Sequence, residues 1–585
     1  MSKIDFTQAY ALRNSMRQEL SMYLPEWELA ARFVSPQRFR KPGARLGARK
    51  DHAIINGQAG LSLRTFQSGM SNGATPRSRP WFNLVSANKA KASSTLIKRF
   101  LSERQQLLNE KFQKSNLYTV LPLAYKDVGV FSNSAFAMLP HATMGFYFYP
   151  YAVGTYAFAC DALGDTNMFT RDFTMSVQQV VKEFGKLTPS GHIDWTTLPA
   201  WVQNEWKAVR YLSTMTMSQL MIPNASYDPR RVNPFDQTTK KFQAYTWAQS
   251  FGANNIPPQS SSGFRSEQSL NPDQFLKISG YSYFPVITPR WEVQAEENYG
   301  VDGPTQMALS DVMALQTKEK FRLEAIAKLV KPPMVGHASL RRHQASILAG
   351  GITYVDDAGA QAGFKPAYEM DPKLSELLQT IEQDTARIKE CYFEHLFSMF
   401  SSGEQKTHVT TVEIQEKAGE KMSALSPVVA QLDRDVLTKV IENGQIMLEE
   451  ARMIPLRPQE LMGENLAPEY ISILAQAQKV SMLASMERGI NFVTSVANAT
   501  QDKNILRLIK AEEFTREYLD FVAIDPKFVA DEAEYKEIQA QGAANDKAQL
   551  DAQNQKTEAE TLKTLSQAEF GKNSALDTMA PEAGI

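Results

Sequence analysis

The feature that most restricts the fold is a long helical pattern, interrupted once, between Pro372 and Arg452. Apolar residues recur every three or four positions in both halves, which marks one face of an α-helix. They are Leu374, Leu377, Leu378, Ile381, Ile388, Tyr392, Leu396 and Met399 in the first half, and Met422, Leu425, Val429, Leu432, Val436 and Val440 in the second. We expect two helices of roughly 28 and 40 residues, about 40 and 60 Å long, which is more than a compact domain requires.

A polar segment, residues 401–410, separates the two helices. Ser401, Ser402 and Gly403 are suited to ending a helix, and Thr410 or Thr411 is suited to capping the next one. The sequence therefore predicts a long helix–loop–helix that the rest of the chain supports.

Length and charge limit the class of protein. A chain of 585 residues is expected to form two to four domains. The formal net charge of −1 gives no global basic field of the kind that simple nucleic-acid binders carry. The charge is uneven, since residues 1–50 hold ten Lys/Arg against four Asp/Glu. The basic stretch 36–51 is expected to be an exposed loop, either contacting a polyanion or acidic partner or simply solvated.

The two cysteines, Cys160 and Cys391, lie in unrelated contexts, which excludes a disulfide framework and argues against a cysteine-based zinc site. No run reaches the roughly 18 apolar residues that a membrane span requires. The N-terminus lacks the charged and then apolar pattern of a secretory signal. We therefore expect no membrane segment, and folding in a reducing cytoplasm.

Motifs for catalysis, cofactors and metals are missing. The chain has no phosphate-binding loop, no dinucleotide fingerprint and no H-E-x-x-H. A G-x-S-x-G occurs at residues 69–73, but a helical pattern precedes it and Pro76 and Pro80 follow it. It therefore lacks the strand–turn–helix context of a nucleophile elbow. The sequence predicts no enzyme, no catalytic residue, no metal and no cofactor, and it favours a structural or conduit role.

The chain is predicted to be α+β and predominantly helical. Outside the long pair, helices are expected over residues 5–34 (kinked or split at Pro25), 52–70, 91–114, 117–130, 173–185 and 303–330, with two or three more within 467–520. Short strands at 134–140, 145–150, 155–161 and 166–172 are expected to form one antiparallel meander, and 241–249 and 277–288 two strands in a strand-poor region. Residues 337–367 are expected to form turns and short strands, and 527–585 a surface helix or a disordered tail.

Several segments, taken in order, resemble the portal (head–tail connector) proteins of T7-like short-tailed bacteriophages, the podoviruses. The N-terminal similarities are Trp27, Phe33-Val34-Ser35-Pro36, Gly69-Met70 and Pro80-Trp81-Phe82-Asn83-Leu84. Later ones are Glu297-Asn298-Tyr299-Gly300, Phe397 before the polar loop, Thr410-Thr411-Val412-Glu413-Ile414 after it, and the closing Pro581-Glu582-Ala583-Gly584-Ile585. Their co-linear order over most of residues 20–520 carries the resemblance.

The resemblance implies the phage portal fold of wing, clip, stem and crown, assembled as a ring of usually twelve subunits. The segments map as wing 1–200, clip 201–295, stem helix 296–334, wing with the long helix pair and tunnel loop 335–455, crown 456–526, and C-terminal helix or disordered tail 527–585.

The resemblance also implies a function. The ring is expected at one vertex of the capsid in the virion, after assembly in the host bacterial cytoplasm, as the channel through which double-stranded DNA is packaged and ejected. The expected partners are further copies of the chain, non-specifically and transiently bound double-stranded DNA, the terminase, the tail adaptor or nozzle proteins that replace it, and the major capsid and scaffold proteins.

By resemblance, residues 401–410 form the tunnel loop that narrows the channel. The candidate channel residues are Ser401, Ser402, Gly403, Glu404, Gln405, Lys406, Thr407 and His408 on the loop, and Lys318, Lys320, Arg322 and Lys328 on the stem helix. Each cation could instead be an intersubunit or surface charge. DNA that slides cannot be bound tightly, because each neutralised phosphate raises the affinity, so a nearly neutral chain suits a conduit.

Two other classes of function stay open. An internal virion or scaffold-like protein without a channel should be helical and extended, and the predicted strands argue against it. The missing motifs argue against an enzyme such as a nuclease or hydrolase.

Overall fold

The computed structural model describes residues 4–41, 44, 47, 52–78, 80–86, 95–233, 236–249, 275–330, 334–335, 365–366, 374–401, 428–454, 466–470, 486–496, 510, 513–515, 518–519 and 532–567. The chain forms two compact units. The first comprises Met1–Asn83, Arg104–Leu456 and Pro468–Arg488, and the second Leu84–Glu103, Arg457–Ala467 and Gly489–Ile585. The chain is mixed α and β and predominantly helical, which confirms the predicted class.

A five-stranded antiparallel sheet occupies the first unit, in the order β10-β9-β8-β5-β4. Its strands are β4 (Tyr156–Cys160), β5 (Thr166–Ser176), β8 (Thr214–Pro223), β9 (Phe242–Ala248) and β10 (Lys277–Tyr281). The central pairs run in long register, for example Thr170 opposite Leu220. The ten-residue β8 lies in a region predicted to be strand-poor, so that prediction is wrong there. The sheet also continues across residue 200, where wing and clip were divided.

A second sheet has the order β11-β2-β3, with β2 (Phe136–His141), β3 (Gly145–Pro150) and β11 (Val286–Ile287). The four strands predicted as one meander are therefore divided between two sheets. The division falls at the turn after β3, where Phe39 bridges Val153. There Gly154 has a φ of 90° and lies so close to the backbone that an added Cβ would be 2.3 Å from the Arg40 carbonyl oxygen. The incoming N-terminal segment thus redirects the chain.

Four helices precede these sheets: α1 (Phe6–Phe33), α2 (Gln58–Ala74), α4 (Thr95–Lys114) and α5 (Leu117–Phe131). Helix α1 packs against β4 and α5 against β3, while α2 packs on α5. Asp5 and Gln8 form a capping box that starts α1. The helix is continuous through Pro25, so of the two alternatives predicted there, a kink or a split, the split is wrong. Helix α2 begins at Gln58, later than predicted. The Asn56 side chain accepts from the Gln58 amide, and the Ile55 and Asn56 amides donate to the side chain of Gln316.

A small helical layer follows β5: α6 (Val177–Phe184), the short pair β6 (Lys186–Leu187) and β7 (Ile193–Asp194), and α7 (Ala200–Lys207). Residues 173–176 continue β5 rather than the predicted helix, because Ser176 caps α6 in a capping box with Gln179. Val177, Val180 and Val202 pack with Met217 of the sheet in one apolar cluster.

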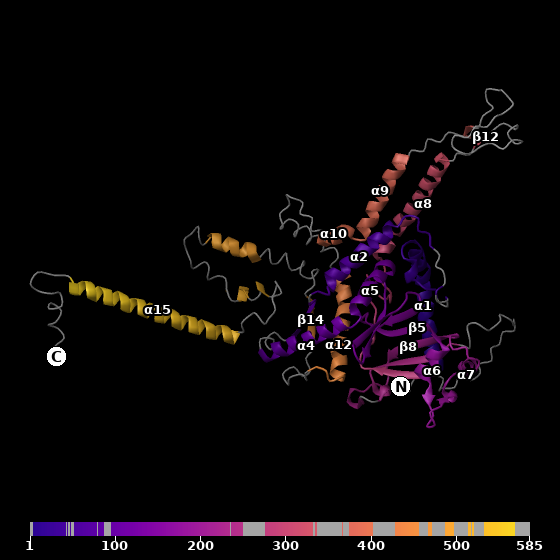
Figure 1. Cartoon of the computed structure of the whole chain (residues 1–585), viewed down its shortest axis with the longest axis horizontal. Helices are drawn as coiled ribbons and strands as arrows, with labels where there is room; N and C mark the ends of the chain where they lie inside the picture. The colour runs from indigo at the N-terminus through magenta and orange to yellow at the C-terminus, as the bar shows by residue number, and fades with distance from the viewer. Residues whose placement is uncertain are drawn as a thin grey trace, which may run out of the picture. The chain divides into compact units, whose positions relative to one another are not determined.

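The long helical pattern is organised differently from the prediction. The predicted stem helix is present as α8 (Pro304–Val330), which packs against α9 (Leu374–Cys391), and Figure 1 shows the two side by side. The first predicted arm is two helices, α9 and α10 (Glu394–Ser401), because Phe393 adopts a φ of 54° between them. The described second arm comprises helical residues 428–432, a π-helix Asp433–Thr438 and α12 (Lys439–Glu450).

The remaining described elements are short or lie in the second unit. The short pair is β12 (Met334–Val335) with β13 (Lys365–Pro366), and β1 (Phe82–Ser86) pairs with β14 (Leu466–Tyr470). A strand at β14 was not predicted, since that segment was placed at the start of a helical region; residues 486–496 are helical. The C-terminal α15 (Glu532–Gln567) agrees with the surface-helix alternative. Single 3-10 turns occupy Pro36–Arg38, Trp195–Thr197, Pro229–Arg231 and Gln237–Thr239.

Buried aromatic side chains form the centre of the first unit. Tyr299 packs against Phe158 of the sheet with ring centroids 4.5 Å apart and against Trp27 of α1 at 5.5 Å. Trp291, also fully buried, meets Phe66 of α2 at 5.7 Å. The segment between β11 and α8 is therefore enclosed by helices and sheet, which sets the position of the α8 N-terminus.

Candidate nucleic-acid interface

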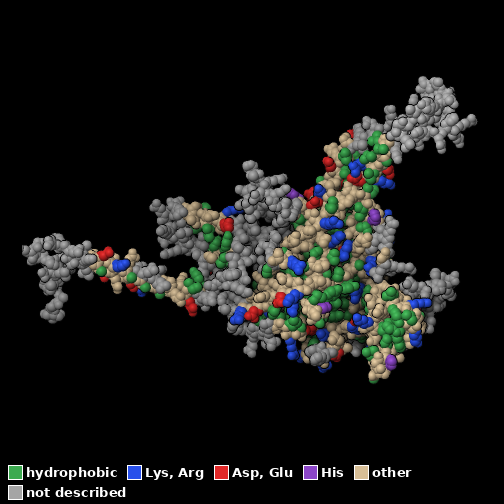
Figure 2. Space-filling view, in the orientation of Figure 1, with side chains coloured by type: hydrophobic (Ala, Val, Ile, Leu, Met, Phe, Trp, Pro, Cys, Tyr) green, Lys and Arg blue, Asp and Glu red, His purple; other side chains and the backbone are tan. Residues whose placement is uncertain are grey.

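Helix α8 changes from buried to exposed along its length. Ala308, Val312 and Leu315 in its first half are completely buried, whereas residues 323 and 324 and 326–330 are exposed. In Figure 2, blue and red side chains are intermixed over the part of the molecule formed by α8 and α9. The predicted stem cations lie on the second half of α8, where the helix leaves the body of the unit.

Lys318 is engaged within the chain. Its Nζ lies 2.7 Å from a carboxylate oxygen of Asp384 on α9, and Asp384 is only 1% exposed. Arg387 also pairs with Asp384 and lies 2.9 Å from Asp311 on α8. These charges join α8 to α9, so Lys318 serves first to compensate a buried carboxylate.

Of the other three stem cations, Lys320 and Lys328 are more accessible, whereas the Arg322 side chain is 33% exposed against 31% for Lys318. Lys320 lies 4.0 Å from Glu324, and both side chains are largely exposed, which makes this a weak pair. Arg322 donates to Glu319 at 2.7 Å. Lys328 is exposed in the last turn of α8. The exposed half of α8 therefore combines cations with nearby glutamates, and the net positive charge available to a polyanion is small.

The predicted tunnel loop falls almost entirely beyond the described part of the chain. Ser401 is the last residue of α10. The other predicted loop residues, Ser402, Gly403, Glu404, Gln405, Lys406, Thr407 and His408, lie outside the described residues.

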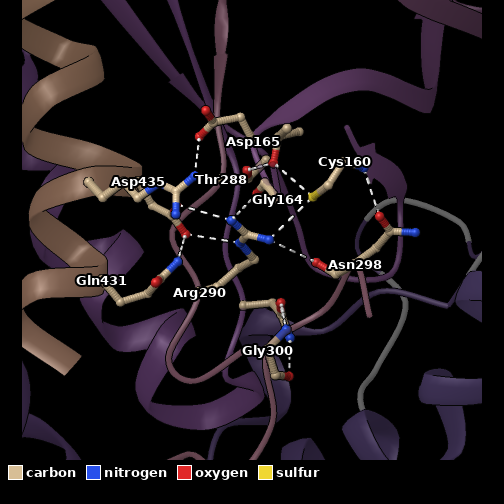
Figure 3. A network of polar contacts seen from close by, with 12 residues as sticks. Cys160, Gly164, Asp165, Thr288, Arg290, Asn298, Gly300, Gln431 and Asp435 are labelled. Atoms are coloured by element: carbon tan, nitrogen blue, oxygen red, sulfur yellow. Dashed lines mark hydrogen bonds and ion pairs between the residues drawn. The ribbon is translucent and has the colours of Figure 1, made fainter. Parts of the chain in front are cut away.

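A buried ion pair fixes the second arm against the segment that leads into α8. Arg290 meets Asp435 of the π-helix with Nε and Nη2 at 2.9 and 3.1 Å from its two carboxylate oxygens. Gln431, one helical turn earlier, donates to the same carboxylate at 3.0 Å (Figure 3). Burial opposes the charged form of Arg290, but the hydrogen bond and charge of Asp435 outweigh it and raise the pKa of the guanidinium.

The remaining donors of Arg290 are satisfied by the sheet and the adjacent loop. Nη2 donates to the Gly164 carbonyl oxygen at 2.8 Å in the β4–β5 turn, and Nη1 donates to the Cys160 sulfur at 3.2 Å and the Asn298 carbonyl oxygen at 3.4 Å (Figure 3). Burial raises the pKa of the Cys160 thiol, although the Arg290 charge opposes the rise. A neutral sulfur thus completes the shell of a buried cation.

Hydrogen bonds also anchor the first turn of α8 to the neighbouring helices. The Thr305 hydroxyl lies 2.6 Å from the hydroxyl of Tyr392, at the end of α9, and donates to the Gly129 carbonyl oxygen at 2.7 Å. Gly303 donates its amide to the Ser132 hydroxyl at 2.9 Å. The interface candidate on α8 therefore projects from a rigid base rather than from a loose linker.

Neither a metal centre nor a membrane helix emerges from the described residues. No group of three or more His, Cys, Asp or Glu side chains among them is placed to hold a metal ion. Within the same part of the chain, no helix combines the length and apolarity needed to cross a bilayer.

Comparison with known proteins places the chain in a family. Residues 7–529 match the model of a family described as the bacteriophage head to tail connecting protein. The chain belongs to this head-to-tail connector family. The connector chain is 28% identical over 571 residues to the portal protein of Salmonella phage epsilon15, covering 97% of each chain. It is 27% identical over 567 residues to the probable portal protein of Bordetella phage BPP-1, covering 96% and 95% of the two chains. These matches confirm the resemblance that the order of motifs predicted.

Sequence reasoning missed the polar contacts that position α8 in the connector. Arg290 and Asp435 are 145 positions apart, and no local pattern marks either residue. Gln316 of α8 is a second case, since its Oε1 accepts from the Ile55 and Asn56 amides at 2.7 and 2.8 Å. An isolated glutamine on a helical face carries no signal for such a contact.

Proposed function

We propose that this chain forms a ring at one vertex of a phage capsid, with twelve copies as is usual for portal rings. The ring is the channel through which double-stranded DNA is packaged and ejected. The similarity to two phage portal proteins over nearly the whole chain carries this proposal. A virion component of this kind also contacts capsid and tail proteins, as the head-to-tail connector family implies.

The exposed face of α8 supports assembly. Leu323, Ile326 and Val330, spaced three and four residues apart on one face of the helix, are 50%, 38% and 72% exposed in the single chain. Large apolar side chains grouped on one helix mark an interaction surface. Subunits of a closed ring meet through two different patches, so this face of one copy covers a different surface of the next.

The charge distribution supports weak, non-specific contact with DNA. Lys320 and Lys328 on α8 are the described candidates most accessible to the duplex, since Asp384 holds Lys318 and Glu319 holds Arg322. Lys406 and His408 on the tunnel loop are the other candidates. Few accessible cations per subunit keep the duplex mobile, because the affinity for DNA rises with each phosphate that is neutralised.

The partners of the ring follow from the same proposal. The terminase docks first on the outer end, at the clip, and tail adaptor or nozzle proteins replace it later, while the wing contacts the major capsid and scaffold proteins. The five-stranded sheet continues from β5 of the assigned wing into β8, β9 and β10 of the assigned clip. A mechanical force applied to the clip would therefore be transmitted to the wing through hydrogen-bonded strands.

Electron microscopy of the purified full-length chain tests the proposal. Rings with a central hole wide enough for a DNA duplex are expected. Monomers or rods under all conditions of concentration and salt would reject the channel, and extended particles without a hole would favour the internal virion or scaffold-like alternative.

Deletion of residues 403–406 tests the tunnel loop separately. The expected result is intact rings with impaired DNA packaging or retention. Loss of ring assembly in this variant would instead assign the segment a structural role.

A further inference from the structure

Each of the two arms that flank residues 402–427 contains one irregular turn. In the first arm, Phe393 has a φ of 54° between α9 and α10. In the second arm, the π-helix Asp433–Thr438 interrupts an otherwise α-helical segment. A bulky residue at positive φ is an outlier, and π-turns are rare and concentrate at functional sites. Both turns are therefore places where the backbone holds a conformation that the surrounding structure must enforce.

One segment contacts both turns. Arg290 forms the buried ion pair with Asp435 inside the π-helix. The next residue, Trp291, packs its ring 6.2 Å from the ring of Phe393. At the other end of the segment, Thr305 meets the Tyr392 hydroxyl at 2.6 Å. Residues 290–305, which lead into α8, thus hold the irregular turn of each arm from one side.

This segment is itself rigid. Glu292 and Val301 form an antiparallel bridge that closes it into a loop. The Asn133 side chain accepts from the Gly300 amide at 2.7 Å and donates to the Gly300 carbonyl oxygen at 2.9 Å. A Cβ on Gly300 would lie 2.7 Å from the Ser132 carbonyl oxygen, so only glycine fits this approach. A displacement of one end of the loop is therefore transmitted to the other.

We propose that residues 290–305, hereafter called the latch, couple the irregular turns of the two arms. The two turns then rearrange together and not one at a time. Conversion of the π-turn to α-helix would rotate the residues before it by about 100° and shift them by about 1.5 Å. That change would carry Asp435 away from Arg290, and strain on the latch would then reach Phe393. The place of these arms in a DNA channel rests on the proposed function, but the latch does not.

Hydrogen exchange of the full-length chain tests the latch. Asp435→Asn removes the charge from the second arm and keeps the side-chain shape. We expect amide exchange to accelerate at least about tenfold both at 433–438 and at 394–401 on the other arm, since each 1.4 kcal/mol of lost local stability corresponds to one factor of ten. The matched control is Asp172→Asn, because Asp172 of β5 also belongs to an ion pair, with Arg13 and Arg17 of α1, and lies on neither arm. This control should leave exchange at 394–401 unchanged.

A second variant acts from the other arm. Tyr392→Phe removes only the hydroxyl that meets Thr305, and we expect it to accelerate exchange at 433–438 as well as at 394–401. Acceleration confined to the mutated arm, in either variant, would overturn the latch, as would equal acceleration in the Asp172 control. Tyr392→Phe decides the matter if Asp435→Asn does not fold. Because exchange is measured without DNA and in any oligomeric state, failure here would leave the proposed channel untouched, and failure of ring formation would leave the latch untouched.

Discussion

Arg290 and Asp435 form a two-point ion pair at 2.9 and 3.1 Å although 145 positions separate them, and their side chains are only 2% and 1% exposed. The pair joins the segment that leads into α8 to the π-helix of the second arm. Because both side chains are buried, the loss of one partner should destabilise the first unit strongly.

Arg290→Met should lower the free energy of unfolding by about 3–5 kcal/mol, because it leaves a buried carboxylate without its cation. Adding Asp435→Asn should restore part of the loss, which a double-mutant cycle in chemical denaturation would detect. The control is Arg210→Met, since Arg210 is mostly exposed and lies 3.5 Å from Glu205. That change should stay within about 1 kcal/mol of the unmodified chain. Equal effects of the two arginine substitutions would contradict the assignment.

Gly69→Ala should destabilise the packing of α2 against α10. An added Cβ would lie 2.1 Å from two ring atoms of Phe397, so the ring must move, at a cost of about 1–3 kcal/mol. Gly60→Ala in the same helix is the matched control, because its nearest contact would be 3.9 Å away. In that variant the higher helix propensity of alanine should increase the free energy of unfolding by at most about 1 kcal/mol. Thermal unfolding of both variants checks the difference in sign.

Asp433→Asn should stabilise the chain at alkaline but not at acidic pH. Burial raises the pKa of Asp433 from 3.8 to about 7. The pKa of Asp433 is higher in the folded than in the unfolded chain. Its contribution to the free energy of unfolding is therefore fully present below pH 3.8 and is lost as the pH rises through about 7. We expect a gain of roughly 1–2 kcal/mol at about pH 8 and little gain at about pH 4. An equal gain at both pH values, or a gain in the exposed control Asp551→Asn, would refute this explanation.

Lys320→Gln and Lys328→Gln should each weaken DNA binding without lowering stability. Each lost phosphate contact should reduce the slope of log affinity against log salt by about 1 per bound copy. Lys318→Gln should behave in the opposite way, with little change in DNA binding and a loss of about 1–3 kcal/mol of stability, because Asp384 stays buried. Fluorescence anisotropy with a DNA duplex over a salt series, together with thermal unfolding, separates the two groups.

Leu323→Ser combined with Val330→Ser should impair assembly while leaving the fold of each chain intact, because both side chains are exposed on one face of α8. Sedimentation velocity should show fewer rings at a given concentration. Met22→Ser on α1, a side chain that is 77% exposed, is the control and should assemble normally. Unchanged assembly of the α8 double variant would exclude this face as the contact between copies.

Helices with a strong local period were predicted well from the sequence. The 3.6-residue pattern and a terminal proline placed α8 within one or two residues, and α1 and α5 followed in the same way. The family was also accessible, since the order of motifs along the chain is a property of sequence alone. By contrast, β8 was missed although its first residues, Thr-Met-Thr-Met, alternate polar and apolar side chains as a half-buried strand does.

The sequence by itself determined the class, the main helices and the family, because these depend on local periodicity and on the order of short motifs. Only the tertiary structure decided which sheet each strand joins, that α9 pairs with α8, that Lys318 is held by Asp384, and that Arg290 meets Asp435. The reason is physical: these outcomes depend on contacts between residues tens to hundreds of positions apart. In such contacts a buried charge takes whichever partner the fold brings within reach.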